Sequence, residues 1–197
     1  MRGQTIEELA IGEFVELTRV AAPYNVAAFL GAIGDDNPVH SDRAFAASTP
    51  FERPIAPGMW ASGLLSAAIG TMLPGPGSIY IKQDLQFLRP VYFGDTITAH
   101  VELVEMMPER NRVRLSTICT NSDGEAVLAG EAWVLPPLRP VIYDEPQRRE
   151  RTPFGVLALA EWASRAAAVW YAAVADGLDY WTGPRSPGLA RRPAATS

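Results

Sequence analysis

The chain has 197 residues, of which 48% are hydrophobic, and it carries a formal net charge of −5 at pH 7. This length suits one well-buried core with an appendage and is short for two full domains. The acidic balance, without a basic stretch that has interleaved aromatic residues, argues against a nucleic-acid-binding protein, although a local basic site for a phosphorylated ligand stays open.

Two features of the sequence indicate the compartment. Residues 1–14 carry acidic side chains where a signal peptide would carry an apolar run. Cys119 is the single cysteine, which excludes an internal disulfide bond and a cysteine-based metal site. We therefore expect a protein of the reducing cytoplasm.

The first predicted elements are a strand and a helix. The strand covers 13–20, where apolar and polar residues alternate, and the helix covers 22–33, with a proline in its first turn. Residues 34–42 then form a dense polar loop, because Asn-Pro and the acidic residues favour turns. We expect Ser41 to cap a short helix over 42–47.

The middle of the chain predicts a buried helix followed by strands. Residues 60–72 are apolar and carry no formal charge, and a helix that is hydrophobic on nearly every side is expected to be buried all round. Long antiparallel strands after one such helix indicate an α+β hot-dog fold over 1–137, with the sheet wrapped around the helix. Strands are predicted over 78–88, 95–105, 112–120 and 125–135.

The composition changes after residue 137. Residues 138–152 are typical of a linker, and 153–182 predict an amphipathic C-terminal helix because Leu159, Trp170 and Trp181 recur at intervals that keep one helical face. This helix packs on the core or a partner subunit, or binds a lipid-like surface. Residues 183–197 are predicted to be disordered.

The chain has only two histidines, and they lie in different settings. His100 belongs to a strand pattern that turns it toward solvent. His40 lies in the polar loop with Asp35, and an imidazole beside a carboxylate can relay protons. The alternative is that these loop residues only cap the flanking helices. The Asn37 amide can hold the loop backbone, and one histidine without a second ligand of its kind predicts no metal site.

Several motifs carry a family resemblance that covers roughly residues 5–137. In this order, they resemble the MaoC-like R-specific enoyl-CoA hydratases, which have the hot-dog fold. The motifs are Gly34-Asp35-Asp36-Asn37-Pro38-Val39-His40-Ser41-Asp42, Ala44-Phe45-Ala46, Ile55-Ala56-Pro57-Gly58-Met59, Leu73-Pro74-Gly75-Pro76-Gly77-Ser78-Ile79-Tyr80, Gln83-Asp84-Leu85-Gln86-Phe87, and Pro90-Val91 leading to Gly94-Asp95-Thr96.

The resemblance implies a homodimer that hydrates trans-2-enoyl-CoA to (R)-3-hydroxyacyl-CoA, with no cofactor besides the coenzyme A of the substrate. It implies that Asp35 and His40 are the catalytic pair and that Ser66 helps to orient the aspartate or the substrate. The backbone N–H of Gly58 would polarise the thioester carbonyl. The chain departs from the family at Pro57, where the family usually has histidine, and this change could alter rate or substrate preference.

The acyl chain is expected to run along the apolar helix, with Met59 and Trp60 at its tunnel. Trp60 either limits the acyl length or only packs in the core. Three other functions remain open for this fold: an acyl-CoA thioesterase, a dehydratase acting on acyl-carrier-protein substrates, and a non-catalytic scaffold. In the last case, 153–182 would contact a lipid body or a polyester granule.

Overall fold

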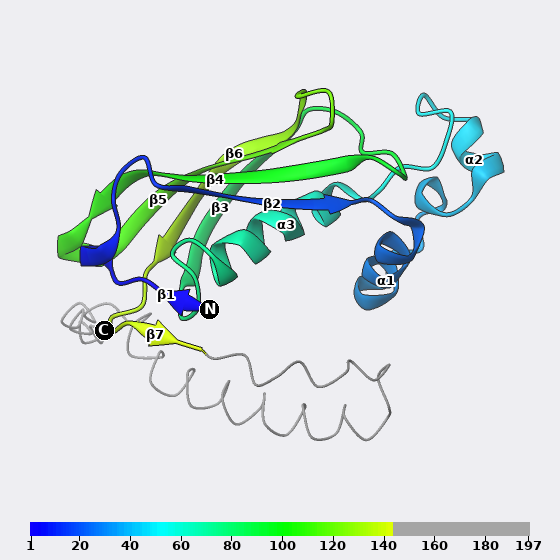
Figure 1. Ribbon diagram of the computed structural model, residues 1–197. Coiled ribbons are helices and arrows are strands. Elements are labelled where there is room, and N and C mark those ends of the chain that lie inside the picture. The colour runs from blue at the N-terminus through cyan, green and yellow to red at the C-terminus, as the bar shows by residue number, and fades with distance from the viewer. Residues whose placement is uncertain (144–197) are drawn as a thin grey trace, which may run out of the picture. The chain divides into compact units, whose positions relative to one another are not determined.

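A computed structural model describes residues 1–143 of the chain, and their fold is a five-stranded antiparallel sheet with one long helix against it (Figure 1). Two short strands pair with each other, and three single 3-10 turns connect other elements. In chain order the elements are β1 (Arg2–Gly3), η1 (Ile6–Glu8), β2 (Phe14–Val20), α1 (Pro23–Ile33), η2 (Pro38–His40), α2 (Arg43–Ala47), α3 (Gly58–Thr71), β3 (Ile79–Phe87), β4 (Thr96–Met107), η3 (Pro108–Arg110), β5 (Arg112–Thr120), β6 (Ala126–Leu135) and β7 (Val141–Ile142).

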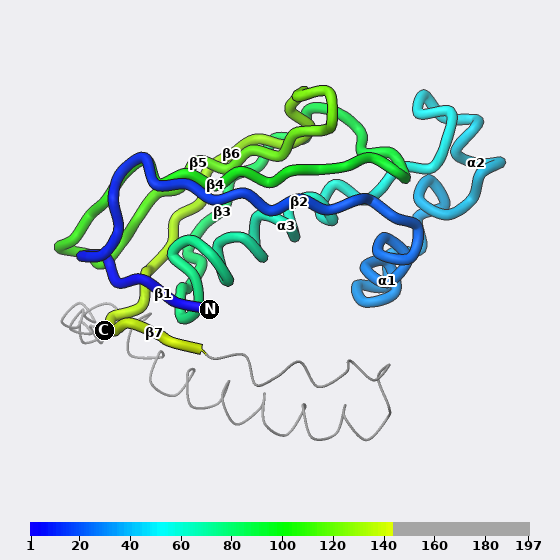
Figure 2. The backbone as a smooth tube through the Cα atoms, viewed as in Figure 1, coloured from blue at the N-terminus to red at the C-terminus, as the bar shows by residue number. Residues whose placement is uncertain are grey.

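The strand order in the large sheet is β2-β4-β5-β6-β3, so β2 and β3 are its edges. Helix α3 packs against β2, β4, β5 and β6. The chain leaves β2, forms α1 and α2 beyond one end of the sheet, and returns as α3 beneath it, as the tube in Figure 2 shows. The predicted α+β architecture, a central helix on an antiparallel sheet in the hot-dog manner, is confirmed for these residues.

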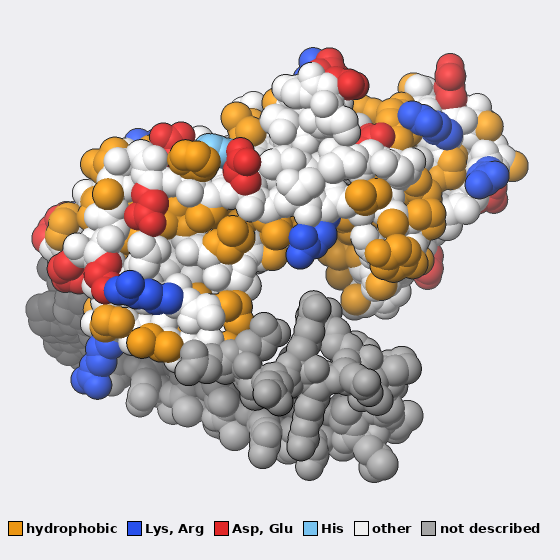
Figure 3. Space-filling view, viewed as in Figure 1, with side chains coloured by type: hydrophobic (Ala, Val, Ile, Leu, Met, Phe, Trp, Pro, Cys, Tyr) orange, Lys and Arg blue, Asp and Glu red, His pale blue; other side chains and the backbone are white. Residues whose placement is uncertain are grey.

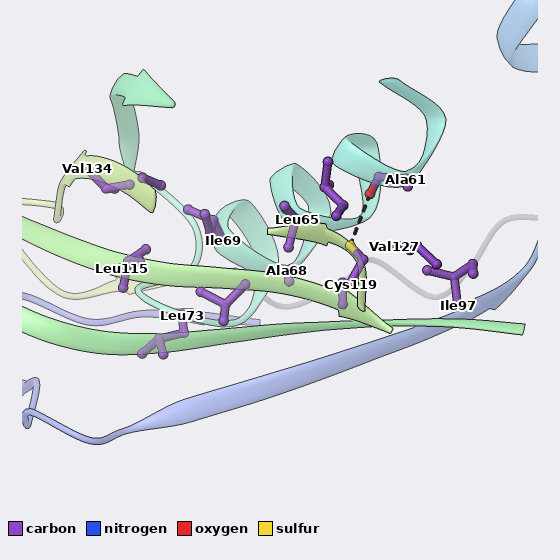
Figure 4. Close-up of a cluster of buried hydrophobic side chains, with 14 of the residues drawn as sticks. Ala61, Leu65, Ala68, Ile69, Leu73, Ile97, Leu115, Cys119, Val127 and Val134 are labelled. Atoms are coloured by element: carbon purple, nitrogen blue, oxygen red, sulfur yellow. Dashed lines mark hydrogen bonds between the residues drawn. The ribbon is translucent and has the colours of Figure 1, made fainter. Parts of the chain in front are cut away.

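The core lies between α3 and the inner face of the sheet (Figure 4). Alternate residues of β4 face it, and Ile97, Ala99, Val101 and Leu103 are fully buried, as the period of two in a strand requires. Cys119 joins this core and donates a weak hydrogen bond to the Ala61 carbonyl. Burial raises the pKa of the Cys119 thiol to about 12, so it remains a protonated packing group.

Helix α3 differs from the expectation in its burial. It starts at Gly58, and one face packs on the sheet through Trp60, Leu65 and Ile69, among others. The expectation of burial all round is wrong for the single chain, because the opposite face is exposed to solvent. That face consists of Met59, Gly63, Ser66, Ala67, Gly70 and Thr71. The small residues along it leave room for another backbone to approach.

The short helix α2 is capped by a different residue from the one expected. The Asp42 carboxylate accepts hydrogen bonds from the backbone N–H groups of Ala44 and Phe45, at 2.8 and 3.1 Å. Ser41 instead ends the 3-10 turn η2, and its N–H donates to the Pro38 carbonyl. The cap is therefore one residue later than predicted, and a carboxylate can serve two amides there.

The chain beyond β6 is described only as far as residue 143. Strand β7, within the segment predicted as a linker, pairs antiparallel with β1. The predicted C-terminal helix over 153–182 and the tail over 183–197 lie outside the described residues. Among residues 1–143, none of the helices combines the length and the apolar character that a membrane crossing needs.

Candidate active site

The polar loop predicted from the sequence connects α1 to α2, and its start is fixed by a glycine. Gly34 adopts a left-handed conformation (φ 68°), and the N–H groups of Gly34 and Asp35 both donate to the Leu30 carbonyl. This is the usual way for a glycine to end a helix, since it has no Cβ to clash. The turn sends Asp35 back toward the next segment of the loop.

Asp35 and His40 face each other across this loop. The Asp35 Oδ2 lies 3.7 Å from the His40 Nε2, while its Oδ1 accepts a hydrogen bond from the Asn37 N–H at 3.0 Å. The Asn37 side chain in turn accepts from the Val39 N–H and caps the turn η2 that carries His40. Asn37 therefore links the aspartate to the turn of the histidine. The His40 side chain is 9% exposed and the Asp35 side chain 28%.

A backbone carbonyl determines which nitrogen of His40 can accept a proton. The His40 Nδ1 lies 2.8 Å from the Ile55 carbonyl oxygen, which can only accept a hydrogen bond. Nδ1 therefore carries hydrogen, and the neutral ring has its lone pair on Nε2, on the side of Asp35. The sequence offered no signal for this contact, because any residue at position 55 supplies a carbonyl.

The amino end of α3 offers unpaired amides. Neither the Gly58 N–H nor the Met59 N–H finds a hydrogen-bond acceptor among residues 1–143, as expected for the first turn of a helix. Pro57 precedes Gly58 with φ −56°, close to the value that its ring imposes, so it fits without strain. The helix dipole adds partial positive charge at this end.

Position 58 has no space for a side chain. A Cβ on Gly58 would lie 2.6 Å from the Phe87 ring, below any normal contact distance. Phe87 comes from the end of β3 and was not predicted as a site residue. Its ring and Gly58 both line an apolar cavity of about 500 Å³ at this end of α3, which includes Phe51, Ile55, Gly58, Met59, Phe87 and Val91.

The candidate site therefore combines the pair of Asp35 and His40, which contacts the Ile55 carbonyl, with the free amides and the apolar cavity at the start of α3 in the described residues. Such a set suits proton transfer on a small molecule whose developing negative charge is stabilised by an amide. Within residues 1–143, no three His, Cys, Asp or Glu side chains gather as metal ligands would.

Comparison with known proteins decides the family. The profile of the MaoC like domain matches residues 9–123, more than half of the chain. The chain belongs to the MaoC-like family.

This MaoC-like protein aligns with its relatives over most of their length. The 3-hydroxybutyryl-CoA dehydratase of Methylorubrum extorquens is 45% identical over 131 residues, which span 66% of this chain and 83% of that protein. The (R)-specific enoyl-CoA hydratase of Rhodospirillum rubrum is 40% identical and is covered to 92%, with 68% of this chain. The unliganded R-hydratase PhaJ1 of Pseudomonas aeruginosa superposes with a TM-score of 0.68 at 40% identity, covering 74% of this chain and 95% of that one.

Two of the residues predicted from the sequence do not line the apolar cavity of this MaoC-like protein. Ser66 is exposed on the open face of α3 and makes no side-chain hydrogen bond with the described residues, so its orienting role stays a prediction. Trp60 is 6% exposed and belongs to the hydrophobic core. Of the pair expected at the tunnel, Met59 lines the apolar cavity and Trp60 does not.

Proposed function

We propose that this MaoC-like protein is an (R)-specific enoyl-CoA hydratase, a hydro-lyase that interconverts trans-2-enoyl-CoA and (R)-3-hydroxyacyl-CoA. The observation that carries the proposal is the pairing of Asp35 Oδ2 with His40 Nε2, 3.7 Å apart. The His40 ring is held by the carbonyl of Ile55, three residues before Gly58, whose amide has no acceptor among residues 1–143. The hydratase and dehydratase relatives at 40–45% identity support the same reaction. Supply of (R)-3-hydroxyacyl-CoA to polyester synthesis or to fatty-acid metabolism fits this activity.

In the proposed mechanism, the Gly58 N–H stabilises charge on the thioester oxygen. Attack on C3 of the enoyl group moves electrons onto that oxygen, and an amide donor there lowers the barrier. One such donor contributes about 2.7–4 kcal/mol in comparable enzymes. The dipole of α3 acts in the same direction, and the apolar cavity beside Gly58 excludes water from the acyl chain.

Asp35 and His40 would hold the water that is added. The His40 Nε2 accepts one proton of this water while its oxygen forms the bond to C3, and the Asp35 carboxylate accepts the other hydrogen as a hydrogen bond. The imidazolium then returns the proton to C2, which completes the addition of H and OH. Because both come from the same side of the substrate, the addition is syn.

A homodimer is the assembly that we propose for this enzyme. Among residues 1–143, the edge strand β3 pairs only with β6 and leaves Ile79, Ile81 and Phe87 substantially exposed. The exposed face of α3 is formed mostly of small residues. A second copy of the chain would cover both surfaces, and apolar surface of this kind favours association.

The domain assignments from the sequence remain part of the proposal. Residues 1–137 would form the hydratase domain, 138–152 a linker, 153–182 a helix that contacts a partner or a polyester granule, and 183–197 a disordered tail. The cytoplasm is the proposed compartment, in keeping with the single free thiol of Cys119.

The test follows two products in the same reaction. With crotonyl-CoA, we expect loss of the enoyl absorbance without release of free thiol, and chiral analysis should identify (R)-3-hydroxybutyryl-CoA. Release of free thiol without hydration would indicate a thioesterase instead. Turnover of crotonyl-acyl-carrier-protein alone would indicate a carrier-protein dehydratase, and no turnover of either thioester would favour a non-catalytic scaffold.

A further inference from the structure

A second pocket lies beside the proposed active site, and two arginines contribute to its lining. It measures about 450 Å³ and is lined by Pro23, Ser41, Arg43, Glu52, Arg53 and Phe93, together with Pro54. Ser41 directly follows His40, so the pocket adjoins the catalytic loop. Figure 3 shows basic side chains in blue over the end of the molecule that carries α2. Two arginines in one pocket suit a negatively charged ligand.

Neither arginine is neutralised within residues 1–143. Arg43 and Arg53 form no ion pair there, and Glu52, the acid of the same pocket, is not paired with either of them. By contrast, Arg89 at the apolar cavity contacts Glu125 and donates to the Ala126 carbonyl. Exposed cations without a carboxylate partner are available to an anion from solution.

The Arg53 side chain is also pre-oriented. Its guanidinium carbon lies 4.0 Å from the centre of the Tyr92 ring. Stacking of this kind holds the guanidinium plane by its face and leaves the N–H groups at its edge free. An edge with several N–H donors fits the oxygens of a phosphate group, which guanidinium groups bind in a bidentate manner.

One short segment separates the two pockets. Phe51, Ile55 and Ala56 line the apolar cavity, whereas Glu52, Arg53 and Pro54 line the basic pocket. Arg53 and Gly58 are five residues apart in sequence, so their Cα atoms lie within about 18 Å. A fatty acyl-CoA has the same division, with an apolar acyl group at one end and a nucleotide with three phosphate groups at the other.

We propose that Arg43 and Arg53 bind the phosphate groups of coenzyme A while the acyl group occupies the cavity beside Gly58. This inference rests on the proposed hydratase function and adds the residues that recognise the carrier of the acyl group. It predicts a preference for CoA thioesters over thioesters that lack the nucleotide, because only the former reach both pockets.

The experiment compares two substrates and two charge-matched variants. Crotonyl-CoA carries the phosphate groups, and crotonyl-N-acetylcysteamine has the same reacting atoms without them. The variant Arg43→Gln/Arg53→Gln removes the two cations of the pocket. The control Arg110→Gln/Arg139→Gln removes two exposed arginines next to β5 and β7, away from α2, and changes the net charge equally.

For Arg43→Gln/Arg53→Gln we expect KM for crotonyl-CoA to rise at least about tenfold with kcat within twofold, as for lost charge-assisted hydrogen bonds at an exposed site. The value of kcat/KM for crotonyl-N-acetylcysteamine should stay unchanged, which also shows that the variant is folded. The control should match the unmodified protein on both substrates. High salt should raise KM for crotonyl-CoA in the unmodified protein but hardly in the variant.

The two substrates distinguish failure of the proposed hydratase function from failure of the phosphate site. If the unmodified protein hydrates neither thioester, the proposed function is wrong. If it hydrates crotonyl-CoA and the variant keeps its KM, or loses activity equally on both substrates, the phosphate site is wrong and the hydratase function stands. An equal rise of KM in the control would mean that only net charge matters, which also overturns the site.

Discussion

The loop before α2 and the outer face of the sheet each contain a histidine beside carboxylates. The two regions differ in which hydrogen bonds and ion pairs these groups form. On the sheet, the His100 Nδ1 lies 3.2 Å from Glu16 and its Nε2 lies 3.8 Å from Glu102, while the ring stacks on Phe14. Nearby, Arg114 is held between two glutamates. The charged groups of His100 and Arg114 thus have partners and remain in contact with solvent.

At the amino end of α3, groups that can take part in catalysis lack hydrogen-bond partners in the described part of the chain. A carbonyl occupies the His40 Nδ1, so its lone pair points toward Asp35, and the first amides of the helix lack acceptors among residues 1–143. Gly58 lines an apolar cavity, and so does Ile55, whose carbonyl contacts His40. Proximity of histidine to carboxylate is thus common to both regions. The candidate site is distinguished by a histidine that contacts a residue of an apolar cavity and by helix amides that lack acceptors among residues 1–143.

The largest expected effect tests this distinction directly. Asp35→Asn and His40→Gln should each lower kcat for crotonyl-CoA at least about a hundredfold, because each removes a group that transfers or holds the proton of the water. His100→Gln is the matched control and should leave kcat within twofold. Steady-state kinetics measure the rates, and circular dichroism checks the fold. Equal losses in the His40 and His100 variants would abolish the difference between the two regions.

A smaller loss of activity is expected when a side chain is added at Gly58, next to the amide that would bind the thioester oxygen. In Gly58→Ala the new methyl group would lie 2.6 Å from the Phe87 ring, so the ring or the amide must move. We expect kcat/KM to fall about 10- to 100-fold, somewhat less than for the complete loss of an oxyanion donor. Gly31→Ala in α1 is the control, since a Cβ there meets no atom within 4 Å.

The second variant Gly58→Ala/Phe87→Leu separates the causes of that loss. If the ring is what displaces the amide, the shorter side chain should restore part of the activity. Full activity of Gly58→Ala alone would show that this end of α3 does not need its present geometry.

The sequence predicted the sheet and its helices well because their patterns are local. The strand over 112–120 has the predicted bounds, since residues alternate between core and solvent along it. The loop motif drew attention to Asp35 and His40, which lie 3.7 Å apart in the structure, while their catalytic role stays a prediction. What it could not supply were contacts made by groups without a sequence signature, such as the Ile55 carbonyl on His40, or distant neighbours such as Phe87 beside Gly58.

The burial of α3 was misjudged for a related reason. A helix with small residues on its second face has the same apolar composition as one enclosed on all sides. Composition does not state which surface covers that face, so the pattern alone could not separate burial in the chain from exposure at Ser66 and Ala67.

A more modest effect concerns the wall of the apolar cavity. Met59→Ala should raise kcat/KM for octenoyl-CoA relative to crotonyl-CoA by about fivefold, because shortening a side chain that lines the cavity makes room for further methylene groups. Trp60→Ala is the comparison, since Trp60 packs in the core and should lower thermal stability without changing this ratio. A ratio that shifts in the Trp60 variant and not in the Met59 variant would reverse the two roles.

The smallest effect belongs to the paired charges of the sheet. The Arg114 side chain bonds to Glu105 and Glu131, and hydrogen bonding to Glu105, with further attraction by Glu131, raises the pKa of its guanidinium, so it stays charged at every accessible pH. Because these groups remain in contact with solvent, Arg114→Gln should lower the free energy of unfolding by less than about 1 kcal/mol in urea titrations. The difference should shrink in 1 M salt, where charges are screened, and hydration activity should not change. A loss of several kcal/mol, or slower hydration, would mean that the outer face of the sheet also contributes to the site.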